Sequence, residues 1–160
     1  TMSRAFVKEQ DDAPEHLTER PVSASPNVVT VRGLRLIDGE IEVLRRSLAQ
    51  AQADADKAAI ARASRDLRYW MQRRATAQVF EPPEMPAQVG FATAATILRE
   101  DGRRQRLAIV GEDEASPGEG RIAYTSPMAR ALLGRTLGEL VEIPGGEAEI
   151  VALEAIRPEG

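Results

Sequence analysis

Cysteine is absent from the 160-residue chain, histidine occurs once, and aromatic residues make up only 4% of it. Without cysteine the chain can form neither a disulfide nor a thiolate zinc site, which fits the reducing cytoplasm. The single histidine, His16, stands in a polar stretch near the N-terminus, so a histidine-based catalytic triad is excluded. Apolar residues make up 42% of the chain, enough for a small aliphatic core.

Long apolar runs are also missing. No stretch approaches the roughly 20 apolar residues that span a bilayer, and the N-terminus lacks a signal-peptide pattern. We therefore expect a cytoplasmic protein that makes no contact with a membrane. The length corresponds to one or two small domains.

The net charge of −4 argues against a nucleic-acid binder by charge alone. Arginine is nevertheless concentrated between residues 60 and 78, where five arginines accompany a single acid, Asp66. This segment is either a solvated helix face or a surface that meets an acidic partner. In the second interpretation the basic face is formed by Arg62, Arg65 and Arg73.

Residues 1–28 combine three prolines with mixed charges and few large apolar side chains, and they are predicted to be a disordered tail. From Thr30, a good N-cap, apolar residues recur at spacings of three and four, the seam of a coiled coil. These residues are Leu34, Ile37, Ile41, Leu44 and Leu48.

A second helical run follows, so residues 29–80 are predicted to form an antiparallel helical hairpin that bends near Gln52 to Lys57. One continuous helix is the alternative, because the bend is rich in alanine and has neither Gly nor Pro. The hairpin is preferred, since a single helix of about 49 residues would leave its seam unburied unless it dimerised.

Residues 81–87 contain three prolines and are predicted to be a linker. After the linker the apolar period becomes two, and residues 88–158 are predicted to form an antiparallel sheet of about five strands. Ser126 to Gly134 interrupts the strands with the pattern of a short helix: Ser126 as N-cap, Pro127 at the first position and Gly134 at the left-handed end. The predicted fold class is α+β.

No catalytic constellation, P-loop or dinucleotide fingerprint is present, and neither a metal site nor a cofactor is predicted. The run Glu112 to Glu114 is interpreted as a solvated loop rather than a cation site. Asp54 and Asp56 fall at the predicted hairpin tip. They either solvate the turn or present acidic groups to a metal or a basic channel.

The stretch Ser126-Pro127-Met128-Ala129-Arg130-Ala131-Leu132-Leu133-Gly134 is close to identical with a motif of the Gre family of bacterial transcript-cleavage factors, and the chain resembles that family over roughly residues 29–158. Further matches are Ile109-Val110-Gly111 with its following acids, Pro144 to Glu147, Arg68-Tyr69, and Val29-Thr30 with Gly33. The resemblance implies an N-terminal coiled coil and a C-terminal domain of FKBP-like fold.

The resemblance also implies a partner, bacterial RNA polymerase, and a docking site at Thr125, Ser126, Pro127 and Met128. The family often has an aspartate where this chain has Thr125. Contact with nascent RNA or DNA is expected to be indirect at most, and the only metal involved would be the magnesium ion of the polymerase. The chain is therefore expected to be a transcription elongation regulator rather than an enzyme.

One departure from the family concerns the tip. Gre factors carry Asp-x-Ser-Glu-Asn there, and this chain has only Asp54 and Asp56, without Ser or Asn. About ten residues are missing from each arm, which shortens the reach by about 15 Å at 1.5 Å per residue. In this the chain resembles the Rnk-type relatives, which have a shortened coil and no cleavage motif. Inefficient transcript cleavage is the expectation, and cleavage through Asp54 and Asp56 is the alternative.

Two further alternatives come from the FKBP-like fold that the resemblance implies and from the coil seam. Prolyl isomerisation would need an aromatic-lined pocket, for which the C-terminal half offers only Phe91 and Tyr124. A homodimer could form through the coil seam, but a monomer is favoured because the hairpin buries that seam within one chain.

Overall fold

The computed structural model describes residues 17–158. The chain divides into two compact units, and each is described by itself. The described part of the first unit comprises residues 17–24 and 37–76, and that of the second comprises residues 25–36 and 77–158. The first residues of the first helix, up to Leu36, group with the C-terminal unit, whereas the sequence analysis assigns all of residues 29–80 to the hairpin.

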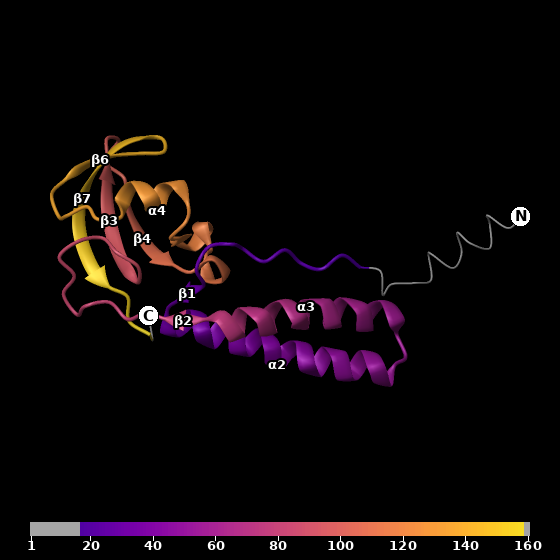
Figure 1. Cartoon of the computed structure of the whole chain (residues 1–160). Coiled ribbons are helices and arrows are strands. Elements are labelled where there is room, and N and C mark those ends of the chain that lie inside the picture. Colours follow the sequence, from indigo (N-terminus) through magenta and orange to yellow (C-terminus); the bar gives the residue numbers. More distant parts are fainter. Residues whose placement is uncertain (1–16, 159–160) are drawn as a thin grey trace, which may run out of the picture. The chain divides into compact units, whose positions relative to one another are not determined.

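Two antiparallel helices form the hairpin, α2 (Val31–Ala53) and α3 (Lys57–Thr76) (Figure 1). The side chains of Ile37, Ile41 and Ala51 are buried and those of Leu44 and Leu48 are half-buried, which follows the predicted spacing of three and four. A turn at residues 54–56 separates the helices, and Ala55 adopts a left-handed φ of 52° there. The prediction of a hairpin rather than one helix is confirmed.

The α2 helix has 23 residues and α3 has 20. At 1.5 Å per residue the arms are about 35 Å and about 30 Å long.

The second unit contains a five-stranded sheet in the order β5-β4-β3-β7-β6. Its strands are β3 (Thr93–Arg99), β4 (Arg104–Val110), β5 (Arg121–Ala123), β6 (Leu140–Ile143) and β7 (Gly146–Ala155). The apolar period of two begins directly after the linker, but β3 begins only at Thr93, because Ala92 has a φ of 64°, which interrupts an extended path.

The prediction of a wholly antiparallel sheet is wrong for one pair. Strands β4 and β5 are parallel, with Ala108 opposite Arg121 and Val110 opposite Ala123. Two short 3₁₀ helices, η2 (Glu112–Glu114) and η3 (Pro117–Glu119), lie in the connection between them. This connection brings the chain back beside Ala108, so that β5 runs parallel to the last three residues of β4. The sheet is therefore mixed, and the fold class remains α+β.

One face of the sheet carries the main core, to which the helix α4 (Pro127–Leu132) contributes. The alternating apolar residues of the strands meet the buried side of that helix. The buried core residues include Ala95, Ile97, Leu107, Ile109, Ala129, Leu132, Val141 and Ile150. A smaller cluster of Ala94, Ala108 and Val110 lies apart from this core, so the helix covers the face that holds the large side chains.

The predicted tail differs from the structure. Residues 1–16 lie outside the described residues, but residues 17–28 follow a defined path. Strand β1 (Val28–Val29) pairs in parallel with β2 (Gln78–Val79), and Asn27 is buried. The C-terminal unit therefore takes in chain from both ends of the hairpin.

Candidate functional site

The corner between β5 and α4 has a rigid local structure. The backbone N–H of Ser126 donates to the carbonyl oxygen of Ala123 at 2.9 Å. The hydroxyl oxygen of Ser126 accepts a hydrogen bond of 3.2 Å from the backbone N–H of Ala129, and Pro127 is the first residue of the helix. Gly134, just beyond the helix, has a φ of 83°. The predicted helix with its cap and its glycine is confirmed.

The outer side of this corner is accessible. Pro127 is exposed, while Thr125, Ser126 and Met128 are half-buried. The Met128 side chain packs against the core. These four predicted binding residues therefore form one continuous corner that packs against the core through Met128. The role of the corner in binding stays a prediction.

An aromatic chain that the sequence analysis missed holds this corner in place. The Tyr124 ring meets Phe91 edge to face at a centroid distance of 5.8 Å, and Phe91 meets Phe80 in the same way at 6.0 Å. The Tyr124 hydroxyl donates to the carbonyl oxygen of Pro26 at 2.6 Å. Pro26 lies just before β1 and Phe80 just after β2. The aromatic chain therefore connects the corner to these two short strands of the same unit.

These contacts weigh against the prolyl isomerase alternative. A cavity of about 240 Å³ lies nearby in the C-terminal unit, and Phe80 is the only aromatic residue among the described residues that line it. Phe91 and Tyr124 pack against each other and against the core instead. An isomerase site needs an apolar, aromatic-lined pocket, and this cavity is lined with charged residues as well.

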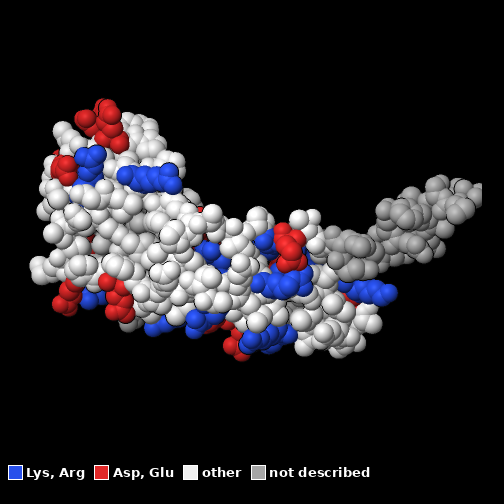
Figure 2. Space-filling model, viewed as in Figure 1, with Lys and Arg blue, Asp and Glu red and all other residues white. Residues whose placement is uncertain are grey.

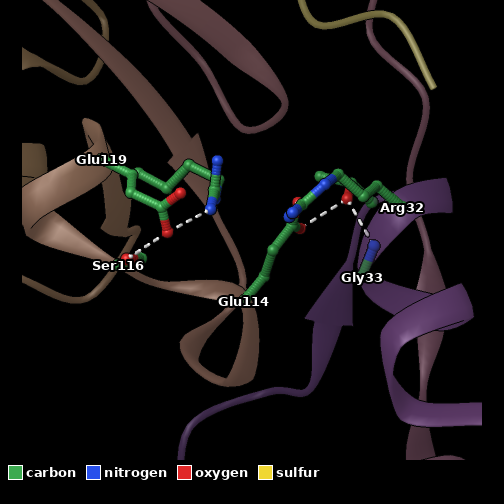
Figure 3. Close-up of polar contacts among 7 residues, drawn as sticks. Arg32, Gly33, Glu114, Ser116 and Glu119 are labelled. Atoms are coloured by element: carbon green, nitrogen blue, oxygen red, sulfur yellow. Dashed lines mark hydrogen bonds and ion pairs between the residues drawn. The ribbon is translucent and has the colours of Figure 1, made fainter. Parts of the chain in front are cut away.

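A buried carboxylate joins the first turn of α2 to the loop after β4 (Figure 3). The side chain of Glu114 is only 2% exposed. It accepts a hydrogen bond of 2.5 Å from the Thr30 hydroxyl and pairs with the Arg32 guanidinium at 3.1 Å. The Thr30 hydroxyl in turn accepts from the backbone N–H of Gly33 at 2.9 Å, which confirms Thr30 as the N-cap. The prediction of a solvated acidic loop is wrong for Glu114.

Gly33 is required by this arrangement. A Cβ atom at this position would lie 2.9 Å from Glu114 Oε1, closer than carbon and oxygen atoms normally approach. The glycine therefore lets the helix backbone come close to the buried carboxylate. Sequence spacing alone could not reveal the pair, because 84 positions separate Thr30 from Glu114.

A second carboxylate on the same loop is exposed and paired. Glu119 accepts hydrogen bonds from the Ser116 hydroxyl at 2.9 Å and from the Arg121 guanidinium at 2.8 Å (Figure 3). The Ser116 hydrogen bond and the Arg121 charge lower the pKa of Glu119 below its ordinary value. Among residues 17–158, no group of three or more His, Cys, Asp or Glu side chains has the arrangement of a metal site.

The two acids at the hairpin tip have local structural partners. The Gln50 amide donates to both carboxylate oxygens of Asp54, at 3.0 and 3.1 Å. The Asp56 carboxylate accepts a hydrogen bond of 3.1 Å from the backbone N–H of Ala59, so it caps the first turn of α3. Both acids are exposed. Asp56 is therefore a helix cap, and Asp54 is held by Gln50 in the last turn of α2.

The predicted basic face of α3 is only partly present. Arg62 is exposed, Arg65 is half-buried and donates to Asp66 at 3.1 Å, and Arg73 is buried at 2% exposure. Arg73 therefore cannot belong to an exposed basic face, and that part of the prediction is wrong. Figure 2 shows basic and acidic side chains interspersed over the visible side of the hairpin. One ion pair between the two helices joins Arg74 and Asp38 at 2.7 Å.

No helix within residues 17–158 is both long enough and apolar enough to cross a membrane.

Comparison with known proteins places these features in context. A family model described as transcription elongation factor GreA/GreB, C-terminal, matches residues 84–156. The transcription elongation factor GreA of Caulobacter sp. (strain K31) is 31% identical over 140 residues, which cover 74% of this chain and 89% of that protein. The GreA of Alkalilimnicola ehrlichii is 42% identical over 83 residues, covering 49% of this chain and 52% of that protein. Among solved structures, the GreA factor homolog Gfh1 of Thermus thermophilus aligns with a TM-score of 0.39 and 19% identity over 79% of this chain and 97% of that one.

Proposed function

The chain belongs to the GreA/GreB family of transcription elongation factors, and we propose that it binds bacterial RNA polymerase through the corner at Thr125 to Met128 and regulates elongation without efficient transcript cleavage. It acts as a non-catalytic factor with no cofactor of its own. The hairpin enters the secondary channel of the polymerase part-way, and the only metal ion in reach of the complex belongs to the polymerase.

The docking part of this proposal is supported by the construction of the corner. Its backbone is held by the Ser126 cap, by the core beneath Met128 and by the Tyr124 hydroxyl, so little conformational freedom is lost when a partner binds. Pro127 projects from this rigid base as an exposed apolar residue. A preorganised corner of this kind is suited to a specific protein contact.

The tip is the observation that carries the non-cleaving part. A carboxylate must reach within about 2.1 Å of a magnesium ion to bind it. The Asp56 carboxylate caps α3 and that of Asp54 accepts from Gln50. The arms have 23 and 20 residues, and the resemblance to Gre factors implies that each is about ten residues, or about 15 Å, short of the family pattern. The second candidate function is cleavage stimulation through these two acids. It is favoured by their exposure at the tip.

Docking is tested with two proline variants. Pro127→Arg alters an exposed proline at the first position of a helix, and Pro117→Arg does the same at η3 of the same unit. Binding of the full chain to core polymerase is measured by fluorescence anisotropy. We expect at least a 10-fold loss of affinity for Pro127→Arg and no comparable loss for Pro117→Arg. Equal affinities for both variants and the parent would contradict docking at the corner.

Cleavage is tested on backtracked elongation complexes, with a full-length GreA relative as positive control. We expect little stimulation by this chain. The variant with Asp54→Asn and Asp56→Asn removes both charges while asparagine still serves as a cap. Strong stimulation by the parent that this variant abolishes would overturn the non-cleaving proposal and establish the second candidate.

A further inference from the structure

Residues 17–24 belong to the same compact unit as the hairpin. In Figure 1 this stretch is the indigo segment that runs beside α3. The carboxylate of Glu19 accepts hydrogen bonds from Arg68 on α3, at 3.1 and 3.0 Å from Nε and at 2.5 Å from Nη2. The contact is a bidentate pair of carboxylate and guanidinium, and this geometry makes such pairs specific.

The neighbouring residue adds a second kind of contact. The guanidinium carbon of Arg20 lies 4.0 Å from the centroid of the Tyr69 ring and 5.7 Å from that of Trp70. Arg20 also pairs with Asp66 at 3.6 Å. Tyr69 and Trp70 meet edge to face at 5.1 Å. Two consecutive residues of the segment therefore cover a guanidinium and an aromatic pair on one stretch of α3.

We propose that residues 17–24 form a releasable strap over Arg68, Tyr69 and Trp70, and that its release exposes this face of α3 to the polymerase. The inference rests on the proposed function and adds a regulatory element to it. The released face offers a guanidinium beside two aromatic rings. An acidic group of the polymerase takes the place of Glu19 on Arg68.

The strap contacts are of a strength that permits release. The side chains of Glu19 and Arg68 are 59% and 57% exposed, and exposed ion pairs contribute little. A cation over an aromatic ring at an exposed site adds a similar small amount. Together these contacts favour the closed strap by at most about 10-fold, because ordering the segment opposes closure. A partner that needs the open face then binds up to about 10-fold more weakly than it would to a chain without the strap.

The strap itself is tested through Trp70, the only tryptophan of the chain. The variant Glu19→Arg places like charges together at Arg68, and the swap Glu19→Arg with Arg68→Glu restores an opposite-charge pair. We expect increased acrylamide quenching of Trp70 in the single variant and quenching close to that of the parent in the swap. Identical quenching of all three proteins would overturn the strap.

The regulatory role is tested by affinity for core polymerase, measured with the full chain. Glu19→Arg is expected to bind up to about 10-fold more tightly than the parent. The control Glu42→Arg makes the same change of charge on the exposed side of α2, where Glu42 pairs with Arg46 at 3.7 Å, and it is expected to bind like the parent. Unchanged affinity of Glu19→Arg, or an equal gain in the control, would overturn the role in regulation. Absence of binding by every variant would overturn the proposed function and that role together, while the quenching result would still decide whether the strap exists.

Discussion

The hydroxyl of Thr30 donates a 2.5 Å hydrogen bond to the buried carboxylate of Glu114, although the two residues are 84 positions apart. One side chain thereby performs two tasks, because the same hydroxyl caps α2 through the backbone N–H of Gly33. The start of the helix is thus attached to the loop after β4 within the C-terminal unit. We therefore expect this pair to contribute to the stability of that unit.

Loss of the Glu114 carboxylate is therefore expected to destabilise the protein. Glu114→Ala leaves the Thr30 hydroxyl without its acceptor and should lower the free energy of unfolding by about 1–3 kcal/mol. Glu114→Gln keeps an acceptor oxygen for Thr30 and should cost less. Urea denaturation measures both, with the exposed Glu100→Ala as a control expected to stay within about 0.5 kcal/mol of the parent. A Glu114→Ala protein as stable as the control would show that the buried contact contributes nothing.

The tyrosine hydroxyl at the corner has a separable contribution. Tyr124→Phe removes the hydrogen bond to the Pro26 carbonyl while keeping the ring, and it should cost about 1 kcal/mol. Tyr124→Ala also removes the edge-to-face contact with Phe91 and should cost at least about 1 kcal/mol more. Thermal unfolding orders the three proteins. Equal stabilities of the Phe and Ala variants would argue against an anchoring role for the aromatic chain.

Capping by Asp56 predicts a difference between two substitutions at the tip. Asp56→Ala removes the acceptor for the Ala59 backbone N–H and should destabilise the hairpin by about 1 kcal/mol. Asp56→Asn should be close to neutral, because asparagine caps helices as well as aspartate does. Helical circular dichroism during denaturation is the measurement. A loss in the Asn variant as large as in the Ala variant would mean that the charge, not the cap, matters at this position.

The strap contact predicts the ionisation of Glu19. The hydrogen bond from Arg68, with the charges of Arg68 and Arg65, lowers the pKa of Glu19 below its ordinary value. The ionised carboxylate is the form that pairs. The contribution of the contact is therefore present above the ordinary pKa and is lost as the pH falls through the lowered one.

Carboxyl ¹³C NMR of the full chain measures this pKa directly. Arg68→Gln should return it towards its ordinary value, while Arg46→Gln, on the other helix, should leave it unchanged. A Glu19 pKa that does not respond to Arg68→Gln would contradict the pairing.

Local patterns in the sequence were sufficient for the two long helices and for α4. The spacing of Ile37, Ile41, Leu44 and Leu48 predicts the buried seam, and Ser126-Pro127 with Gly134 predicts α4 and its limits, because caps and periodicity act within a few residues. The predicted corner is a continuous surface for the same reason. Its use as a docking site is a matter of partner binding, which folding patterns do not encode.

Only the tertiary structure decided the contacts between segments that are distant in the sequence. The parallel β4–β5 pair depends on the path of the loop between them, and the burial of Arg73 depends on what packs around α3. The run of three acids predicts that Glu114 is exposed, yet its side chain is buried against Thr30. The sequence predicts that the strap is disordered, because a polar segment with few large apolar side chains cannot form a core of its own. A short polar segment can nevertheless be held in place by charge and ring contacts with a helix that lies about 49 residues further along the chain.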